Sequence, residues 1–249
     1  MNITSRDFVP PIITRVIEKI RNPQTNKYPF NAIPFSFNPR LIVDVGANIG
    51  DVALAALKSF PQAHIICFEP VKNTYIKLLD RLTSLKGRVT FYNKALSDRE
   101  GEAEINITNF HGANSIEKLT QFHKIFNPSI REMRKEKIEL VMLDNVFSTF
   151  PEELIDILKI DVEGHELQVL NGGENTIKNN VDTIFIEAAL QRDASWEEQH
   201  FLNIFNVLEN WGFRLVNIYD VCSETNGMKE TDMLITQFDC VFRHKRYLK

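Results

Sequence analysis

Acidic side chains follow several apolar runs of this 249-residue chain, and their spacing is the first sign of chemistry. The run 41–45 contains Asp44 and passes into a turn with Gly46 and Gly50, and the next apolar run ends at Glu69. An apolar strand that opens into a glycine turn, with an acid at the end of the next strand, is typical of a nucleoside site in a parallel sheet. Each acid alone also fits a helix cap or a solvated strand end, so the prediction depends on the pair.

A second acidic group lies later in the chain. The apolar run 155–160 ends at Asp161, Glu163 and His165 stand on the following turn, and Glu187 ends the next run. Parallel strands bring their carboxyl ends to one edge of a sheet, where side chains can position an acceptor and remove its proton. We predict Asp161 and Glu163 as the base or as acceptor-orienting groups, with His165 as the third candidate.

Structural roles stay open for the same residues. Glu163 can stabilise the first turn of a helix through the helix dipole, and His165 taken alone fits an exposed first-turn histidine. The oxygen ligands of this group also suit magnesium, but the sequence does not show that they converge, so no metal is assigned.

The glycine turn departs from the dinucleotide pattern G-x-G-x-x-G, whose positions here are Gly46, Asn48 and Asp51. Asn48 places a side chain where a pyrophosphate approaches the backbone, and Asp51 already satisfies the helix N-terminus and repels phosphate. S-adenosylmethionine fits better, because it has no phosphate and its sulfonium cation tolerates acids. Gly50 would let the backbone approach this ligand, and Glu69 would accept hydrogen bonds from both ribose hydroxyls.

The elements that must position these residues alternate between strand and helix, which predicts a parallel sheet with helices on both faces. Strands are expected at 41–45, 64–69, 88–94, 102–107, 138–143, 155–161, 183–187, 213–219 and 232–242, and helices at 50–60, 72–85, 163–178 and 197–210. Pro151 is expected to start a short helix, and the last strand is expected to join antiparallel through the turn Asn226-Gly227.

Two segments lie outside this alternation. Residues 1–40 predict a helix followed by a clasp rich in proline and aromatic residues, and residues 41–249 form the main domain. Residues 109–137 are polar and weakly patterned, which predicts a lid or insertion. Its first residues, 111–115, suit either a segment that closes over a cofactor or an ordinary loop.

Composition excludes several classes of protein. The chain has 29 basic and 33 acidic residues and a formal net charge of −4, so nothing points to a nucleic-acid partner. Cys67, Cys222 and Cys240 lack metal-site or redox spacing and are expected to be reduced, which indicates a cytoplasmic protein. No signal peptide or membrane span is recognised, and the oligomeric state stays open.

Four blocks of this sequence, taken together and in this order, resemble the FkbM-type methyltransferases. They are Asp44–Gly50, Phe68–Pro70, Ala95–Asp98 and Lys159–Glu166, and the resemblance covers roughly residues 41–190. It implies a class I methyltransferase fold, a Rossmann-like α/β three-layer sandwich with a seven-stranded, mostly parallel sheet and an antiparallel last strand. It also implies S-adenosylmethionine as methyl donor and a small-molecule hydroxyl acceptor, often on a sugar or natural product.

The same resemblance implies a set of cofactor contacts. Ala95 and Leu96 would contact the adenine, and Asp98 either accepts from its amino group or belongs to a polar turn. The full set expected to bind the cofactor is Asp44, Gly46, Ala47, Asn48, Gly50, Glu69, Pro70, Ala95, Leu96, Ser97, Asp98 and Asp161. Two alternative functions are a nicotinamide-dependent oxidoreductase, which Asn48 and Asp51 disfavour, and a non-catalytic module that binds the cofactor or a partner enzyme.

Overall fold

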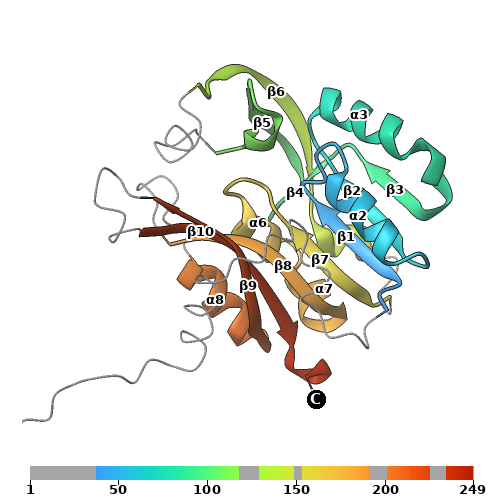
Figure 1. Ribbon diagram of the computed structural model, residues 1–249, viewed down its shortest axis with the longest axis vertical. Coiled ribbons are helices and arrows are strands. Elements are labelled where there is room, and N and C mark those ends of the chain that lie inside the picture. The colour runs from blue at the N-terminus through green and yellow to red at the C-terminus, as the bar shows by residue number, and fades with distance from the viewer. Residues whose placement is uncertain (1–37, 118–128, 149–152, 191–200, 225–233, 249) are drawn as a thin grey trace, which may run out of the picture.

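The computed structural model describes residues 38–117, 129–148, 153–190, 201–224 and 234–248. Its main sheet contains β1 (Leu41–Val45), β2 (His64–Phe68), β3 (Val89–Tyr92), β7 (Ile155–Ile160), β8 (Val181–Ala189), β9 (Phe213–Glu224) and β10 (Leu234–His244). The spatial order of these seven strands is β3-β2-β1-β7-β8-β10-β9 (Figure 1). The pairs from β3 to β8 are parallel, whereas β10 runs antiparallel to both of its neighbours. This topology confirms the predicted class I fold.

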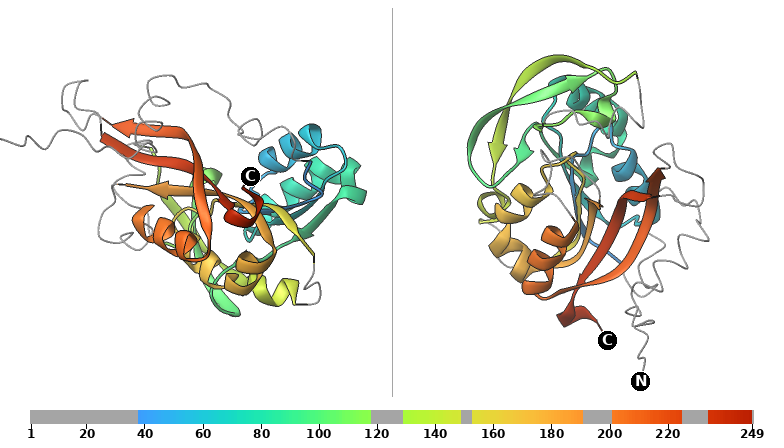
Figure 2. Two further views of the ribbon diagram at one scale, coloured as in Figure 1. Left: turned by 90° about the horizontal axis from the view of Figure 1, so that it is seen from below. Right: turned by 90° about the vertical axis from the view of Figure 1, so that its left-hand side faces the viewer.

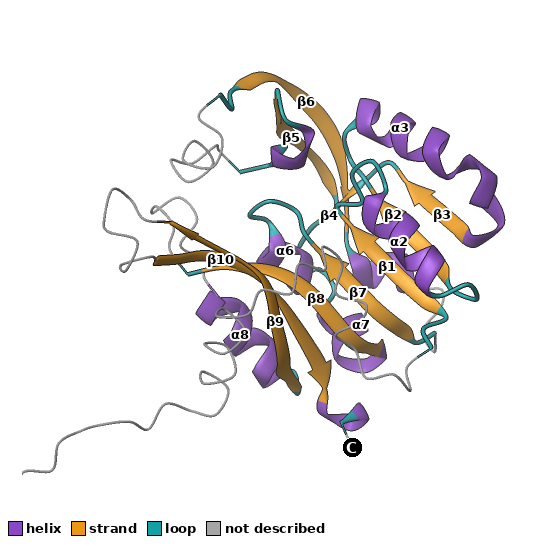
Figure 3. Cartoon of the chain, viewed as in Figure 1, coloured by secondary structure: helices purple, strands orange, loops and turns teal. Residues whose placement is uncertain are grey.

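Helices cover both faces of the sheet (Figures 2 and 3). One face carries α2 (Asp51–Ser59) and α3 (Lys72–Leu82), and the other carries α5 (Leu143–Phe147), α6 (Glu166–Asn171), α7 (Glu174–Asn180) and α8 (Phe201–Asn210). Ile42 and Ile157 belong to the core under the first pair of helices, and Val43 and Leu158 belong to the core on the opposite face. Successive strand residues point to opposite faces, so both halves of each apolar run are buried.

A smaller sheet lies beyond the end of β3. It contains β4 (Ala95–Leu96), β5 (Gly101–Thr108) and β6 (Glu132–Val141) in the order β4-β6-β5, and the short helix η3 (His111–Ala113) follows β5. We call β5, η3 with the residues after it up to Glu117, and β6 the arm. The arm stands away from the main sheet in the right-hand view of Figure 2.

Part of the predicted lid therefore forms a regular strand, because β6 begins at Glu132. The sequence signal was weak there because most residues of this stretch are exposed. Cross-strand ion pairs accompany the backbone pairing, with Lys135 Nζ 3.5 Å from Glu104 Oε2 and Lys137 Nζ 3.8 Å from Glu102 Oε2. Such charge pairs favour antiparallel pairing without an apolar alternation.

The prediction of one helix over 163–178 is wrong, because the chain forms α6 and α7 with a break at Gly172 and Gly173. A Cβ on Gly172 would lie 1.8 Å from the carbonyl oxygen of Ser97, so this position packs directly against backbone. After the break α7 begins, and its N-terminus is capped by a side chain from another helix. Asp144 of α5 accepts hydrogen bonds from the backbone N–H groups of Asn175 at 3.1 Å and Thr176 at 2.7 Å.

Smaller differences concern element boundaries. The expected strand 138–143 ends at Val141, and α5 begins within its last residues. The helix expected at 72–85 ends at Leu82 and continues as the 3-10 helix η2 (Thr83–Arg88). Cys67 and Cys240 are buried and free. Among the described residues, no helix is long and apolar enough to cross a membrane.

Several predicted features lie outside the described residues. They are the N-terminal helix with most of the clasp, the helix start at Pro151, the first residues of the helix at 197–210, and the turn Asn226-Gly227.

The packing at Gly172 predicts the outcome of two matched substitutions. Gly172→Ala should lower the free energy of unfolding by about 2–3 kcal/mol, because the added methyl group must displace the backbone at Ser97. Gly87→Ala is the control, since a Cβ at Gly87 meets no atom within 4 Å. Urea denaturation of both variants checks this, and equal stabilities would contradict the packing argument.

Candidate functional site

A pocket lies at the carboxyl ends of β1, β2 and β7, beside the arm. Predicted site residues that line it are Gly46, Ala47, Asn48, Glu69, Pro70, Ala95, Leu96, Asp161, Glu163 and His165. The arm contributes Ile105, His111, Gly112, Asn114 and Ile116 to the same lining. The structure thus brings both predicted groups, the glycine turn and the Asp161 block, into one site, and the arm covers part of it.

Four of the predicted site residues do not line the pocket. Asp44 is buried beneath it, and Ser97 is buried behind His165. Asp98 accepts a hydrogen bond from Ser97 Oγ at 3.2 Å. A Cβ on Gly50 would lie 2.7 Å from Leu78 Cδ1, so the close approach at this glycine is to α3. The cofactor contacts of these four residues, like those of the residues that line the pocket, stay predictions.

The glycine turn is shaped by its neighbours. Gly46 has a φ of 74°, and a Cβ there would lie 1.9 Å from the carbonyl oxygen of Asp161, so this position requires glycine. The backbone N–H groups of Gly46 and Ala47 donate to the carbonyl of Phe68 at 3.1 and 2.9 Å. Asn48 follows with a φ of 49°, and its buried Oδ1 has no hydrogen-bond donor among the described residues. This oxygen suits a ligand that carries an N–H or O–H group.

Glu69 closes the other side of the turn. Its Oε2 accepts from the backbone N–H of Asn48 at 3.0 Å, and its Oε1 accepts from that of Val71 at 2.9 Å. Burial raises the pKa of this carboxyl to about 7, although both N–H groups favour the charged form. Each carboxylate oxygen keeps a further lone pair, so Glu69 can still accept from two ribose hydroxyls.

A buried lysine joins β1 and β7 beneath the pocket. Lys159 Nζ lies 3.2 Å from Asp44 Oδ1 and 3.3 Å from Asp161 Oδ2, and it donates to the carbonyl of Gly46 at 3.1 Å. The two carboxylates raise the pKa of Lys159 against the effect of burial. Burial raises the pKa of Asp44, and Lys159 opposes this rise. No role was predicted for Lys159 from the sequence. Its position inside an apolar strand is the signal that could have indicated a buried, paired charge.

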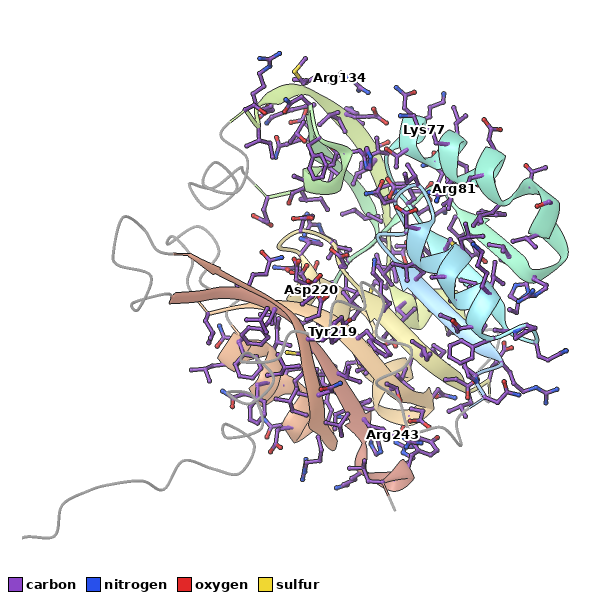
Figure 4. The ribbon with its side chains drawn as sticks, in the orientation of Figure 1. Lys77, Arg81, Arg134, Tyr219, Asp220 and Arg243 are labelled. Carbon is purple, nitrogen blue, oxygen red and sulfur yellow. The ribbon has the colours of Figure 1, made fainter. Side chains whose placement is uncertain are left out.

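Further acids stand near Asp161 on the neighbouring strands. Burial raises the pKa of Glu187 well above its ordinary value, and the charges of Glu163 and Asp161 raise it further. On β10, burial and the charge of Asp161 raise the pKa of Asp239 to about 8. Asp220 of β9, labelled in Figure 4, adds to the effect on Asp239. Glu187, Asp239 and Asp220 are not among the residues that line the pocket. Their carboxyl groups are crowded beside Asp161, so a cation bound near Asp161 would be favoured.

The turn between β7 and α6 places the predicted catalytic residues. Glu163 has a φ of 55°, and the buried Glu166 accepts from the backbone N–H groups of Val162 at 3.1 Å and Gly164 at 3.2 Å. His165 is only 5% exposed, which excludes the exposed first-turn alternative.

The arm is tied to this turn. Ser115 Oγ donates to the carbonyl of Glu163 at 2.5 Å, which holds the segment after η3 against the pocket. In the part of the chain that the structure describes, no group of three or more His, Cys, Asp or Glu side chains could hold a metal ion.

Comparison with known proteins identifies relatives of this chain. The family model described as "Methyltransferase FkbM domain" matches residues 44–215. Methyltransferase sdnD from Sordaria araneosa is 30% identical over 203 residues, which cover 71% of this chain and 74% of that protein. The 2-O-methyltransferase NoeI from Sinorhizobium fredii is 28% identical, with 55% of this chain and 58% of that protein covered. The hexuronic acid methyltransferase AglP from Haloferax volcanii is 26% identical, with 58% and 54% covered.

The buried carboxyl groups predict how stability depends on pH. The pKa values of Glu69 and Asp239 in the folded protein are about 7 and about 8, raised from ordinary values of 4.5 and 3.8. Between about pH 4.5 and 8 the folded state holds protons that the unfolded state releases, so the free energy of unfolding falls as the pH rises.

Urea denaturation of the ligand-free protein at pH 5.5 and at pH 8 measures this fall. Asp239→Asn should remove on the order of 2 kcal/mol of the difference, because the amide does not titrate. Asp80→Asn, at an exposed acid of α3, should leave the difference unchanged. If the stability of Asp239→Asn depends on pH as that of the unmodified protein does, Asp239 does not cause the fall in the free energy of unfolding.

Proposed function

Because the chain belongs to the FkbM methyltransferase family, whose methyl donor is S-adenosylmethionine, we propose that it methylates a hydroxyl group of a small molecule. The observation that carries this proposal is the convergence of the Asn48–Glu69 turn with Asp161, Glu163 and His165 around one pocket. The expected acceptor is a sugar or a natural product. Two relatives support O-methylation and a sugar acceptor by their names, 2-O-methyltransferase and hexuronic acid methyltransferase.

The residues that line the pocket fit the donor. Pro70, Val71, Ala95, Leu96 and Ile105 provide an apolar region for the adenine. Glu69 would accept from the ribose hydroxyls, and the unpartnered Oδ1 of Asn48 would accept from the amino group of the methionine part.

The acidic side of the pocket suits the charge of the donor. When bound, the donor supplies a methyl group on a sulfonium centre, and the carboxylate of Asp161 would lie close to this positive charge. We assign Asp161, Glu163 and His165 to the positioning and deprotonation of the acceptor hydroxyl.

Cofactor binding gives the first test. Calorimetry with S-adenosylmethionine should show binding, and Glu69→Ala should weaken it by about 1.5–3 kcal/mol, because hydrogen bonds to a charged group are lost. Glu69→Gln keeps one acceptor oxygen and should lose less affinity. Glu153→Ala, at an exposed position, should bind S-adenosylmethionine as tightly as the unmodified protein. Binding of NAD without binding of S-adenosylmethionine would instead support the oxidoreductase alternative.

Turnover gives the second test. A screen of sugar and natural-product hydroxyls with labelled S-adenosylmethionine should yield a methylated acceptor. Asp161→Asn and Glu163→Gln should then each lower kcat by about 10–100-fold, because the acceptor loses orienting or deprotonating groups. Asp80→Asn serves as the control. Cofactor binding without transfer to any acceptor would favour the non-catalytic module, and full kcat in both variants would remove these residues from catalysis.

A further inference from the structure

A chain of four side chains connects the pocket wall with the base of the arm. Ser97 Oγ lies 3.2 Å from Asp98 Oδ1 and 3.0 Å from His165 Nε2. On the other side of the imidazole ring, His165 Nδ1 lies 3.6 Å from Glu117 Oε1, beyond a normal hydrogen bond but within ion-pair range. Ser97 is fully buried and His165 nearly so, so bulk water does not compete for the contact between them.

These contacts indicate which ring nitrogen of His165 carries the proton. A carboxylate only accepts, so Ser97 donates its single hydroxyl proton to Asp98. With this proton directed at Asp98, Ser97 Oγ offers lone pairs to His165, and we assign Nε2 as the donor in their hydrogen bond. A neutral imidazole with its proton on Nε2 has a bare lone pair on Nδ1.

Besides Asn48 Oδ1, the Nδ1 atom of His165 is a second buried polar atom that indicates a ligand. It is buried, it belongs to a residue that lines the pocket, and it makes no hydrogen bond with any residue that the structure describes. A lone pair that faces a carboxylate lacks the proton that such a contact requires. A hydroxyl group from the pocket would supply this proton.

We propose that His165 Nδ1 is the atom that takes the proton of the acceptor, an inference that rests on the proposed function. The acceptor oxygen forms a bond to the methyl carbon while the carbon–sulfur bond breaks, and the electron pair of that bond goes to sulfur. The hydroxyl proton passes to Nδ1. His165 becomes an imidazolium whose new N–H faces Glu117 and whose Nε2–H still donates to Ser97.

Glu117 is a positioning residue in this arrangement. Its carboxylate compensates the charge that forms on His165, in the way that an acid beside a catalytic histidine does. The Glu117 side chain is 35% exposed, so it can shift to admit a hydroxyl at Nδ1 and return to ion-pair range once the proton has moved. Ser97 and Asp98 are also positioning residues, because they select the tautomer of the His165 ring. The block Ala95–Asp98 thus has a role besides the adenine contacts.

Asp161 is less suited than His165 to take the proton. Asp161 Oδ2 already faces the ammonium group of Lys159 at 3.3 Å, and protonation would end this ion pair. An imidazole is also a stronger base than a carboxylate at neutral pH, which matches the removal of a proton from a weakly acidic hydroxyl.

The tautomer can be measured without an acceptor. Nitrogen-15 correlation spectra of the full-length protein at neutral pH, with and without S-adenosylhomocysteine, should show His165 protonated on Nε2 and bare on Nδ1. Ser97→Ala should produce a mixture of tautomers, because Nε2 loses its partner. A proton on Nδ1 in the unmodified protein, or an unchanged tautomer in Ser97→Ala, would overturn the proposal.

Kinetics with the acceptor found in the screen give a second readout. His165→Ala should lower kcat by at least about 100-fold, leave the Kd for S-adenosylmethionine within twofold, and recover part of its turnover when imidazole is added. Glu117→Gln should lower kcat about tenfold and move the acidic limb of its pH profile to lower pH, because the imidazolium loses its countercharge. Glu102→Gln, an exposed acid of β5, is the matched control.

These outcomes separate the two proposals. If the unmodified protein does not bind S-adenosylmethionine, the proposed function itself fails. If it transfers methyl groups but His165→Ala keeps its kcat, or loses it without rescue by imidazole while still folded, His165 is not the base.

Discussion

The charge of Lys159, held between Asp44 and Asp161, is the interaction on which the rest of the site depends. The register of the sheet pairs Asp44 of β1 directly with Lys159 of β7, so backbone pairing alone brings the two charges together. A buried charge is tolerated only with a partner, and removing one partner typically costs about 3–5 kcal/mol. The lysine also donates to the carbonyl of Gly46, so the same ammonium group joins both strand ends and the glycine turn.

Two walls of the pocket depend on these contacts of Lys159, which we call the Lys159 joint. Gly46 lies against the carbonyl of Asp161, where a residue with a Cβ would clash. The turn then places the backbone N–H of Asn48 where it donates a hydrogen bond to Glu69. On the other side, the buried Glu166 fixes the turn after Asp161 and leaves His165 inside the wall. Ligand contacts are thus arranged by backbone groups and buried charges before any ligand arrives, which lowers the cost of ordering them on binding.

The sequence predicted the sheet, the main helices and the convergence of the two acidic groups, because these depend on local apolar runs and on the geometry of parallel strands. It did not predict the break at Gly172, since the cause is the backbone of Ser97, far away in the chain. It also did not predict the burial of His165, which depends on Ser97 and on the arm. The strand β6 was missed in part because cross-strand charges, rather than an apolar alternation, accompany its pairing.

The arm enters the chain between β4 and β7 and folds largely on itself. Its two strands pair along their length, and its residues Ile105, Ile138 and Leu140 form an apolar cluster with Val71 and Ala95 of the pocket lining. Its ties to the pocket include the contact between Ser115 and Glu163 and the packing of a few side chains. Substitutions in the arm can therefore accumulate without disturbing the Lys159 joint. The outer positions of the arm can therefore change over evolutionary time while Lys159 and the glycine turn that it supports stay the same.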